Sequence, residues 1–307
     1  MSSSNPLSPY TPVTLLLALL DPWRFLFLSV SHIPATLRSL YRSSSLLSSL
    51  PFTSAFSSAW FGTFWATVGP NVRDGNWERL TALLDGRISQ GKIHEERVGP
   101  AIGGRVIEVG PGTGLWVGVF AEGAPRVEEG EGGTDEGLRQ RKAGVKGGVT
   151  KVFGIEPSVD MHPQLRENIA KAGLEGKYEI VPVGIESLAS SGRVERESVD
   201  SIVTLLCLCS IPDPEYNIKE LYSYLKPGGR WYVFEHVKCL PQQGWMMSAY
   251  QAVVNVFWPM CLGGCQLRRD TEKSLRAAGQ WSSIDLVFTE AEQWCTVCPH
   301  ILGTLTK

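Results

Sequence analysis

Two hydrophobic stretches, residues 13–20 and 25–30, dominate the start of the chain and are separated by a short polar sequence that contains Asp21, Pro22 and Arg24. Together the stretches are about as long as the roughly 20 apolar residues that cross a bilayer. A charge at the centre of such a span costs about 2.5–3.5 kcal/mol. The pattern therefore predicts a broken or re-entrant helix that lies in the membrane interface.

Residues 1–73 form the first predicted domain, an apolar helical segment with one acidic residue and four arginines. The aromatic residues of 54–67 suit an interfacial belt, so we expect the membrane contact to cover residues 1–67. No basic residue precedes Arg24, which disfavours a signal peptide. A mitochondrial presequence and a helical lid on the catalytic domain remain alternatives.

Residues 74–307 form the second predicted domain, in which apolar runs typical of strands alternate with helical periodicity. We predict strands at 106–109, 152–155, 178–183, 201–207 and 230–234, and helices at 115–121, 160–172 and 214–225. This alternation indicates βαβ units and a parallel sheet covered on both faces. The runs 284–288 and 295–305 predict an antiparallel hairpin at one edge. The fold class is therefore α/β, a doubly wound, mostly parallel seven-stranded sheet with a reversed C-terminal strand.

Residues 123–150 are rich in glycine and charge and contain few apolar side chains. Burial in such a segment cannot offset the conformational entropy lost on ordering. We interpret it as a flexible surface insertion in the second domain.

Composition narrows the functional classes. The 307 residues are 43% hydrophobic and carry a net charge of -2, so the chain can form a core but has no general basic field for nucleic acid. We therefore expect no nucleic-acid partner. Seven cysteines, an odd number in a long chain, argue against a disulfide-stabilised secreted fold.

The strongest chemical signal is the sequence Glu108–Gly114, in which three glycines alternate with other residues after a predicted strand and before a predicted helix. A dinucleotide site needs Gly-x-Gly-x-x-Gly and room for a pyrophosphate, which the carboxylate of Glu108 would repel. The same carboxylate suits the ammonium group of a methionine. Glu156, at the end of the next strand, can accept hydrogen bonds from two ribose hydroxyls. Together these features favour S-adenosylmethionine over NAD as the cofactor.

The order of the motifs extends this interpretation. The chain from about residue 76 to the C-terminus resembles class I S-adenosylmethionine-dependent methyltransferases at residues 106–114, 154–157, 198–203 and 225–229. More narrowly, residues 206–211, 234–237 and 258–269 resemble the membrane-anchored thiol methyltransferase-like family and its fungal relatives. In that family, an apolar N-terminal segment precedes the catalytic domain.

The resemblance implies a set of cofactor contacts. It places Glu108 near the amino group, Glu156 on the ribose and Pro157 beside the adenine. It assigns the cradle and the adenine edge to these residues: Gly110, Gly112, Thr113, Gly114, Gly184 and Glu186. Many relatives have an aspartate at the position of Gly184, so the adenine contact here passes to backbone or to Glu186. The spacing from Gly110 to Glu156 is about twice the usual twenty or so residues, and the insertion accounts for it.

His236 follows the fifth predicted strand and is the candidate catalytic base, with an unperturbed pKa near about 6.5. A purely structural histidine is the alternative. The apolar helix at 245–258 suits the roof of an acceptor pocket, although core packing is the default. The pairs Cys261/Cys265 and Cys295/Cys298 have spacings seen in zinc sites, but such pairs are common by accident, and we expect no metal.

The sequence therefore predicts a methyltransferase that acts on a heteroatom of a small lipophilic acceptor. The resemblance favours a thiol and the cytosolic surface of the endoplasmic reticulum or of lipid droplets, with a mitochondrial membrane as the alternative. Two other functions remain open: an O- or N-methyltransferase of a biosynthetic pathway, and a non-catalytic membrane-docked scaffold with the same fold.

Overall fold

The computed structural model describes residues 12–42, 53–121, 148–289 and 294–307. Contacts divide the chain into two compact units. The first unit comprises residues 1–64, 236–269 and 290–299, and the second comprises residues 65–235, 270–289 and 300–307. The apolar N-terminal segment therefore shares its unit with two C-terminal segments. The boundary predicted after residue 73 falls within α3 (Ser54–Leu84).

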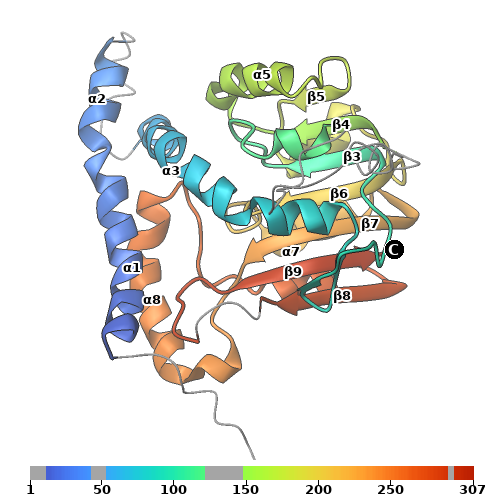
Figure 1. Ribbon diagram of the computed structural model, residues 1–307. Helices are drawn as coiled ribbons and strands as arrows, with labels where there is room; N and C mark the ends of the chain where they lie inside the picture. The colour runs from blue at the N-terminus through green and yellow to red at the C-terminus, as the bar shows by residue number, and fades with distance from the viewer. Residues whose placement is uncertain (1–11, 43–52, 122–147, 290–293) are drawn as a thin grey trace, which may run out of the picture. The chain divides into compact units, whose positions relative to one another are not determined.

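A seven-stranded sheet organises the second unit. Its strands are β3 (Gly104–Val109), β4 (Val149–Ile155), β5 (Tyr178–Val181), β6 (Val199–Leu205), β7 (Leu225–His236), β8 (Ser283–Phe288) and β9 (His300–Thr306). The strand order is β5-β4-β3-β6-β7-β9-β8, with β5 and β8 at the edges (Figure 1). The pairs β5–β4, β4–β3, β3–β6 and β6–β7 are parallel, whereas β8 and β9 are antiparallel. This confirms the predicted doubly wound sheet with a reversed C-terminal strand.

The core of the second unit lies where apolar strand residues meet the helices. Val106 and Val152 are fully buried, as are Leu165 on a helix and Leu80 in the second half of α3. The helices of this unit are α5 (His162–Lys171), α6 (Leu188–Ser191), α7 (Pro214–Tyr222) and α9 (Thr271–Arg276). The remaining short elements of this unit are β1 (Ile88–Ser89), β2 (Lys92–Ile93) and the 3-10 turns η1 (Val117–Phe120), η2 (Val159–Met161) and η3 (Ile185–Ser187).

Three predicted elements differ from the structure. The helix predicted at 115–121 is wrong in type: successive i to i−3 hydrogen bonds of Gly114, Val117 and Val119 continue the glycine turn into η1. The strand predicted from residue 295 begins at His300, because side chains bind the carbonyls of residues 294–297 that a ladder would use. Residues 123–147 of the predicted insertion lie outside the described residues, and its last two residues begin β4.

The first unit contains α1 (Pro12–Ser31), α2 (Ile33–Arg42), the start of α3 and α8 (Gly244–Cys261), with the turn η4 (Pro241–Gln243) before α8. The predicted broken or re-entrant helix is not interrupted at the polar sequence 21–24: α1 continues through Pro22, and the chain turns at His32 before α2. Within the described residues, one helical stretch, Leu15–Arg42, is long and apolar enough to cross a membrane.

Gln251 holds several segments of the first unit together. Its side chain is fully buried on α8. Its carbonyl oxygen accepts a hydrogen bond from the Cys239 N–H at 2.9 Å, and its amide donates to the carbonyls of Val297 at 2.9 Å and Leu267 at 3.2 Å. These three segments have no regular partner strand at this point. The amide group therefore supplies the hydrogen bonds that a ladder would otherwise make.

We expect Gln251→Leu to destabilise the protein by about 3 kcal/mol, because it leaves a buried N–H and buried carbonyls without partners. Thermal unfolding in mild detergent measures the effect. Gln242→Leu is the matched control, because Gln242 is exposed one residue before the same buried Gln243. Equal melting temperatures for the two variants would contradict the role of Gln251.

Candidate cofactor site

The candidate site lies at the carboxyl ends of the central strands of the second unit. β3 has β4 on one side and β6 on the other, so the chain crosses over in opposite directions from this strand. In open α/β sheets, ligands bind beyond the strand ends at such a switch point. The glycine turn follows β3, and Glu156 follows β4.

Glu108 lies at the buried end of β3, with only 3% of its surface exposed. The Tyr178 hydroxyl donates a hydrogen bond to its Oε2 atom at 2.5 Å. Burial raises the pKa of Glu108 from the usual 4.5 to about 7, against the lowering effect of the Tyr178 hydrogen bond. The tyrosine reaches Glu108 across Gly154, where a Cβ atom would collide with the hydroxyl. Sequence analysis missed Tyr178, because its position at the start of a predicted strand carries no chemical signal.

The three glycines of the turn all have positive φ angles, but they serve different contacts. A Cβ atom at Gly110 would lie 3.0 Å from the Cβ of Cys207, and one at Gly114 would lie 2.9 Å from Leu165. These two glycines are required by packing within the protein. A Cβ at Gly112 would meet no described heavy atom within 4 Å. Gly112 is therefore the point at which a ligand can approach the backbone most closely.

Thr113 is tied to the turn through its backbone. Its carbonyl accepts a hydrogen bond from the Asn168 side chain of α5 at 2.8 Å. This hydrogen bond joins the glycine turn to α5, the helix that follows β4. The turn is therefore held in place before any ligand binds.

Glu156 links the glycine turn to the end of β4. Its Oε2 accepts the Gly112 N–H and its Oε1 accepts the Ser158 N–H, both at 2.8 Å. Burial raises its pKa, and the two backbone hydrogen bonds and the nearby His162 oppose that rise. Each carboxylate oxygen has a second lone pair, so both can still accept a ligand hydroxyl. Pro157, the next residue, is exposed.

Gly184 and Glu186 follow β5. The Glu186 carboxylate lies over the Cα of Gly184, in the space that a side chain at residue 184 would need. This explains the departure at residue 184 from the aspartate of many relatives. The carboxylate comes from two residues further along the chain, so an acidic group is still present beside this turn.

A second buried carboxylate network joins β6 to β7. Glu235 is fully buried, and its two oxygens accept the backbone N–H groups of Cys207 and Leu208 at 3.1 Å each. Burial, with the negative charge of Glu235, raises the pKa of the Cys207 thiol well above its usual value. Cys207 packs against Gly110, and its raised pKa disfavours the thiolate form.

The Methyltransferase domain family matches residues 77–281, two thirds of the chain. The chain belongs to this family. The thiol S-methyltransferase TMT1B of Rattus norvegicus is 33% identical over 157 residues, 48% of this chain and 61% of the relative. The thiol S-methyltransferase TMT1A of Homo sapiens is 30% identical over 159 residues, 51% of this chain and 62% of the relative. The match thus spans less than two thirds of the length of either curated relative.

Solved structures are similar to the methyltransferase at lower identity. The [4+2]-cyclase SpnF is 18% identical with a TM-score of 0.48, covering 80% of this chain and 94% of that chain. An arsenic(III) S-adenosylmethionine methyltransferase from Chlamydomonas reinhardtii is 17% identical with a TM-score of 0.41, covering 66% of this chain and 62% of that chain.

S-adenosylmethionine is the cofactor of this methyltransferase. The structure fits this cofactor at Gly112, where a Cβ atom would meet no described heavy atom within 4 Å and where the backbone N–H binds the buried Glu156. The cofactor supplies an activated methyl group on a sulfonium.

His236, the predicted base, ends β7 and belongs to the first unit, whereas the residues described above belong to the second. It is buried, and its Nε2 lies 3.0 Å from the Cys265 sulfur. Trp258 Nε1 donates to the same sulfur at 3.3 Å. Sequence analysis treated Cys265 only as one of a cysteine pair and missed its contact with His236, which arises from residues 29 positions apart. The catalytic role of His236 stays a prediction.

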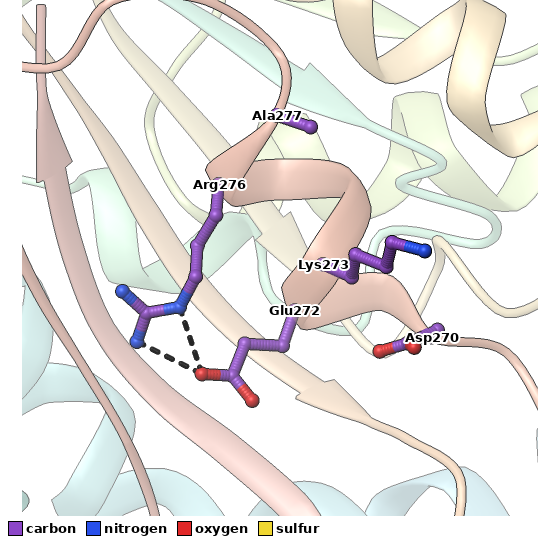
Figure 2. Close-up of a pocket in the computed structure, with 5 residues that line it drawn as sticks. All are labelled: Asp270, Glu272, Lys273, Arg276 and Ala277. Atoms are coloured by element: carbon purple, nitrogen blue, oxygen red, sulfur yellow. Dashed lines mark hydrogen bonds and ion pairs between the residues drawn. The ribbon is translucent and has the colours of Figure 1, made fainter.

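A hollow of about 460 Å³ beside α9 is a separate feature of the second unit (Figure 2). It is lined by Asp270, Glu272, Lys273, Arg276 and Ala277. Glu272 and Arg276 form an ion pair at 2.8 Å across one helical turn. The lining contains none of the predicted cofactor residues.

The raised pKa of Glu108 predicts a specific dependence of stability on pH. Between pH 4.5 and about 7, the folded protein holds a proton on Glu108 that the unfolded chain has lost. The unfolding free energy of the wild type, relative to that of Glu108→Gln, should therefore fall as pH rises through this window. The expected fall is on the order of 3 kcal/mol.

Denaturant unfolding without cofactor at several pH values measures this difference. Glu175→Gln is the control, because Glu175 is exposed and its removal should leave the pH profile unchanged. Parallel profiles for the wild type and Glu108→Gln would contradict the assignment.

Proposed function

We propose that this methyltransferase transfers a methyl group to the thiol of a small lipophilic acceptor at a membrane surface. The observation that carries the proposal is the similarity to two thiol S-methyltransferases, at 33% and 30% identity. The apolar N-terminal helix supports the membrane setting. A lipophilic acceptor fits that setting, because such molecules concentrate in membranes.

The proposed reaction is a direct displacement. The bond between the acceptor sulfur and the methyl carbon forms as the bond between that carbon and the cofactor sulfur breaks. The cofactor product leaves as a neutral thioether, and the thiol proton passes to a base or to water. Because the methyl group is already activated, the protein mainly aligns the acceptor and assists loss of the proton.

We assign the cofactor contacts to the residues around the glycine turn. Glu108 would face the amino group in its ionised form, and Glu156 would receive the ribose hydroxyls on its remaining lone pairs. Gly112 would form the floor of the cradle between Gly110 and Gly114, with Thr113 at its centre. Pro157 would pack beside the adenine, with Gly184 and Glu186 at its edge.

The proposed location follows from residues 1–67. We expect them to hold the enzyme on the surface of the endoplasmic reticulum or of lipid droplets, with the catalytic domain in the cytosol. A mitochondrial membrane is the alternative location. Fractionation of cells that express the full-length chain separates these compartments.

Incubation of the purified enzyme with labelled cofactor and a panel of lipophilic thiols, phenols and amines tests the proposed reaction. We expect label in the thiols and none in the matched phenols and amines. Gly112→Val is the inactive control, because its side chain fills the open face of the turn. Label only in phenols or amines would favour the O- or N-methyltransferase function. No labelled product together with no cofactor binding by calorimetry would favour the scaffold.

The proposed role of His236 predicts a pH-dependent defect in His236→Gln. A thiol with a pKa of about 8.5 is only a few per cent ionised at neutral pH, so a base helps most there. We expect kcat/KM for the thiol to fall roughly tenfold near neutral pH and to approach the wild-type value near pH 9.

Cys265→Ser is the matched variant, because it keeps a hydrogen-bonding group beside His236. A loss of activity in His236→Gln that is equal at every pH would mean that His236 only positions its neighbours.

A further inference from the structure

α8 is apolar on its outward side as well as on its inward side, where Met247, Val254 and Trp258 are buried. Its exposed positions recur at helical spacing and are all apolar: Trp245, Met246, Ala249, Val253, Val256, Phe257 and Met260. The exposed fractions are 79% for Trp245, 67% for Met246 and 64% for Val256. Its inward side carries the buried amide of Gln251 and the half-buried amide of Asn255, both hydrogen-bonded. Residues 244–261 contain no charged side chain.

α1 is likewise apolar on both sides, with Leu26 buried on its inward side. Its outward side exposes Leu16, Leu17, Leu20, Phe27 and Leu28, and Phe27 is 76% exposed. Its inward side buries Ser29, whose hydroxyl donates to the Cys261 carbonyl at 2.7 Å. The charges of Asp21 and Arg24 lie among the exposed leucines, but they pair with each other at 3.1 Å.

The two helices lie side by side and run in the same direction. Tyr250 donates to the Leu19 carbonyl, Trp23 contacts Phe257 with ring centroids 5.8 Å apart, and Ser29 reaches Cys261. Phe257 belongs to the exposed stripe of α8, and Trp23 lies one helical turn from Leu20 and Phe27 on α1. The two apolar stripes therefore adjoin. We name them together the α1/α8 face.

Charge favours a lipid surface over a protein partner for this face. The sequence of the first unit carries six basic side chains, Arg24, Arg38, Arg42, Lys238, Arg268 and Arg269, against three acidic side chains, Asp21, Glu290 and Glu292. The whole chain, in contrast, has a net charge of -2. A second copy docked on the same face would bring like charges together. Anionic headgroups attract such a surface, at about 1 kcal/mol per basic residue near the membrane.

We propose that the α1/α8 face is embedded in the acyl region of an anionic membrane, so that α8 is a second membrane-binding element beside the N-terminal segment. This inference rests on the proposed membrane association and extends it to residues more than 200 positions from α1. Both helices would lie along the interface with their apolar stripes in the acyl chains. Neither helix would then need to span the bilayer, and the Asp21–Arg24 pair would stay near the headgroups.

Flotation of the full-length protein with vesicles of phosphatidylcholine that contain about 30% phosphatidylserine tests the proposal. The α8 variant combines Met246→Gln, Val253→Gln and Val256→Gln. The α1 variant combines Leu16→Gln, Leu17→Gln and Leu20→Gln. The control variant combines Ile93→Gln, Val98→Gln and Tyr216→Gln, which are exposed apolar positions of the second unit. All the substituted side chains are more than 40% exposed, so melting temperatures should change little.

We expect the α8 variant to need at least about tenfold more lipid for half-maximal binding, and the control variant less than about twofold more. If the α1 variant loses binding and the α8 variant does not, the inference about α8 fails while the proposed membrane association stands. If the wild type does not float, the membrane association itself fails. A dimer in detergent-free solution that the α8 substitutions dissociate, without a change in vesicle binding, would identify a second copy as the occupant and overturn the inference.

Discussion

The cofactor site depends on the burial of two carboxylates at neighbouring strand ends. Removed from water, each must receive hydrogen bonds from the protein: Glu156 from the backbone of Gly112 and Ser158, and Glu108 from the Tyr178 hydroxyl. The bond between Gly112 and Glu156 holds the glycine turn against the end of β4. Burial raises the pKa of both carboxyl groups, and the hydrogen bonds lower it only in part. A ligand that brings positive charge and hydroxyl donors would complete the compensation for their burial.

The first unit differs from the second in the apolar side chains that it exposes. In the second unit, apolar residues such as Val106 and Ile202 fill the core. The first unit also buries apolar residues such as Phe64 and Val254, but in addition it exposes Trp245 and Phe27 on the outward sides of α8 and α1. A helix surrounded by water gains nothing from this arrangement, because the exposed apolar area remains unfavourably hydrated. The same arrangement is stable where hydrocarbon replaces the water.

The elements that were predicted wrongly have local patterns typical of one structure but hydrogen bonds that favour another. The apolar run after Gly114 has helical composition, yet the turn geometry of the glycines propagates as 3-10 bonds. Residues 295–299 look like a strand, yet the side chains of Gln243 and Gln251 bind that backbone instead. Pro22 is typical of a helix break, yet α1 continues through it without the backbone hydrogen bond that proline cannot donate. Of these three cases, only residues 295–299 are decided by partners distant in sequence, Gln243 and Gln251.

Periodicity and motif order by themselves determined the strand succession, the reversed C-terminal strand and the glycine turn with its two acids, because these follow from local propensities and from residues a few positions apart. Tertiary structure alone decided which partners those groups find. It brought Tyr178 to Glu108, Cys265 to His236 and the Glu186 carboxylate over Gly184. It also decided how α8 is turned about its axis. The sequence analysis left the orientation of this helix open. In the structure, Gln251 and Asn255 face inward, where they bind backbone groups of three other segments, and the apolar stripe lies outside.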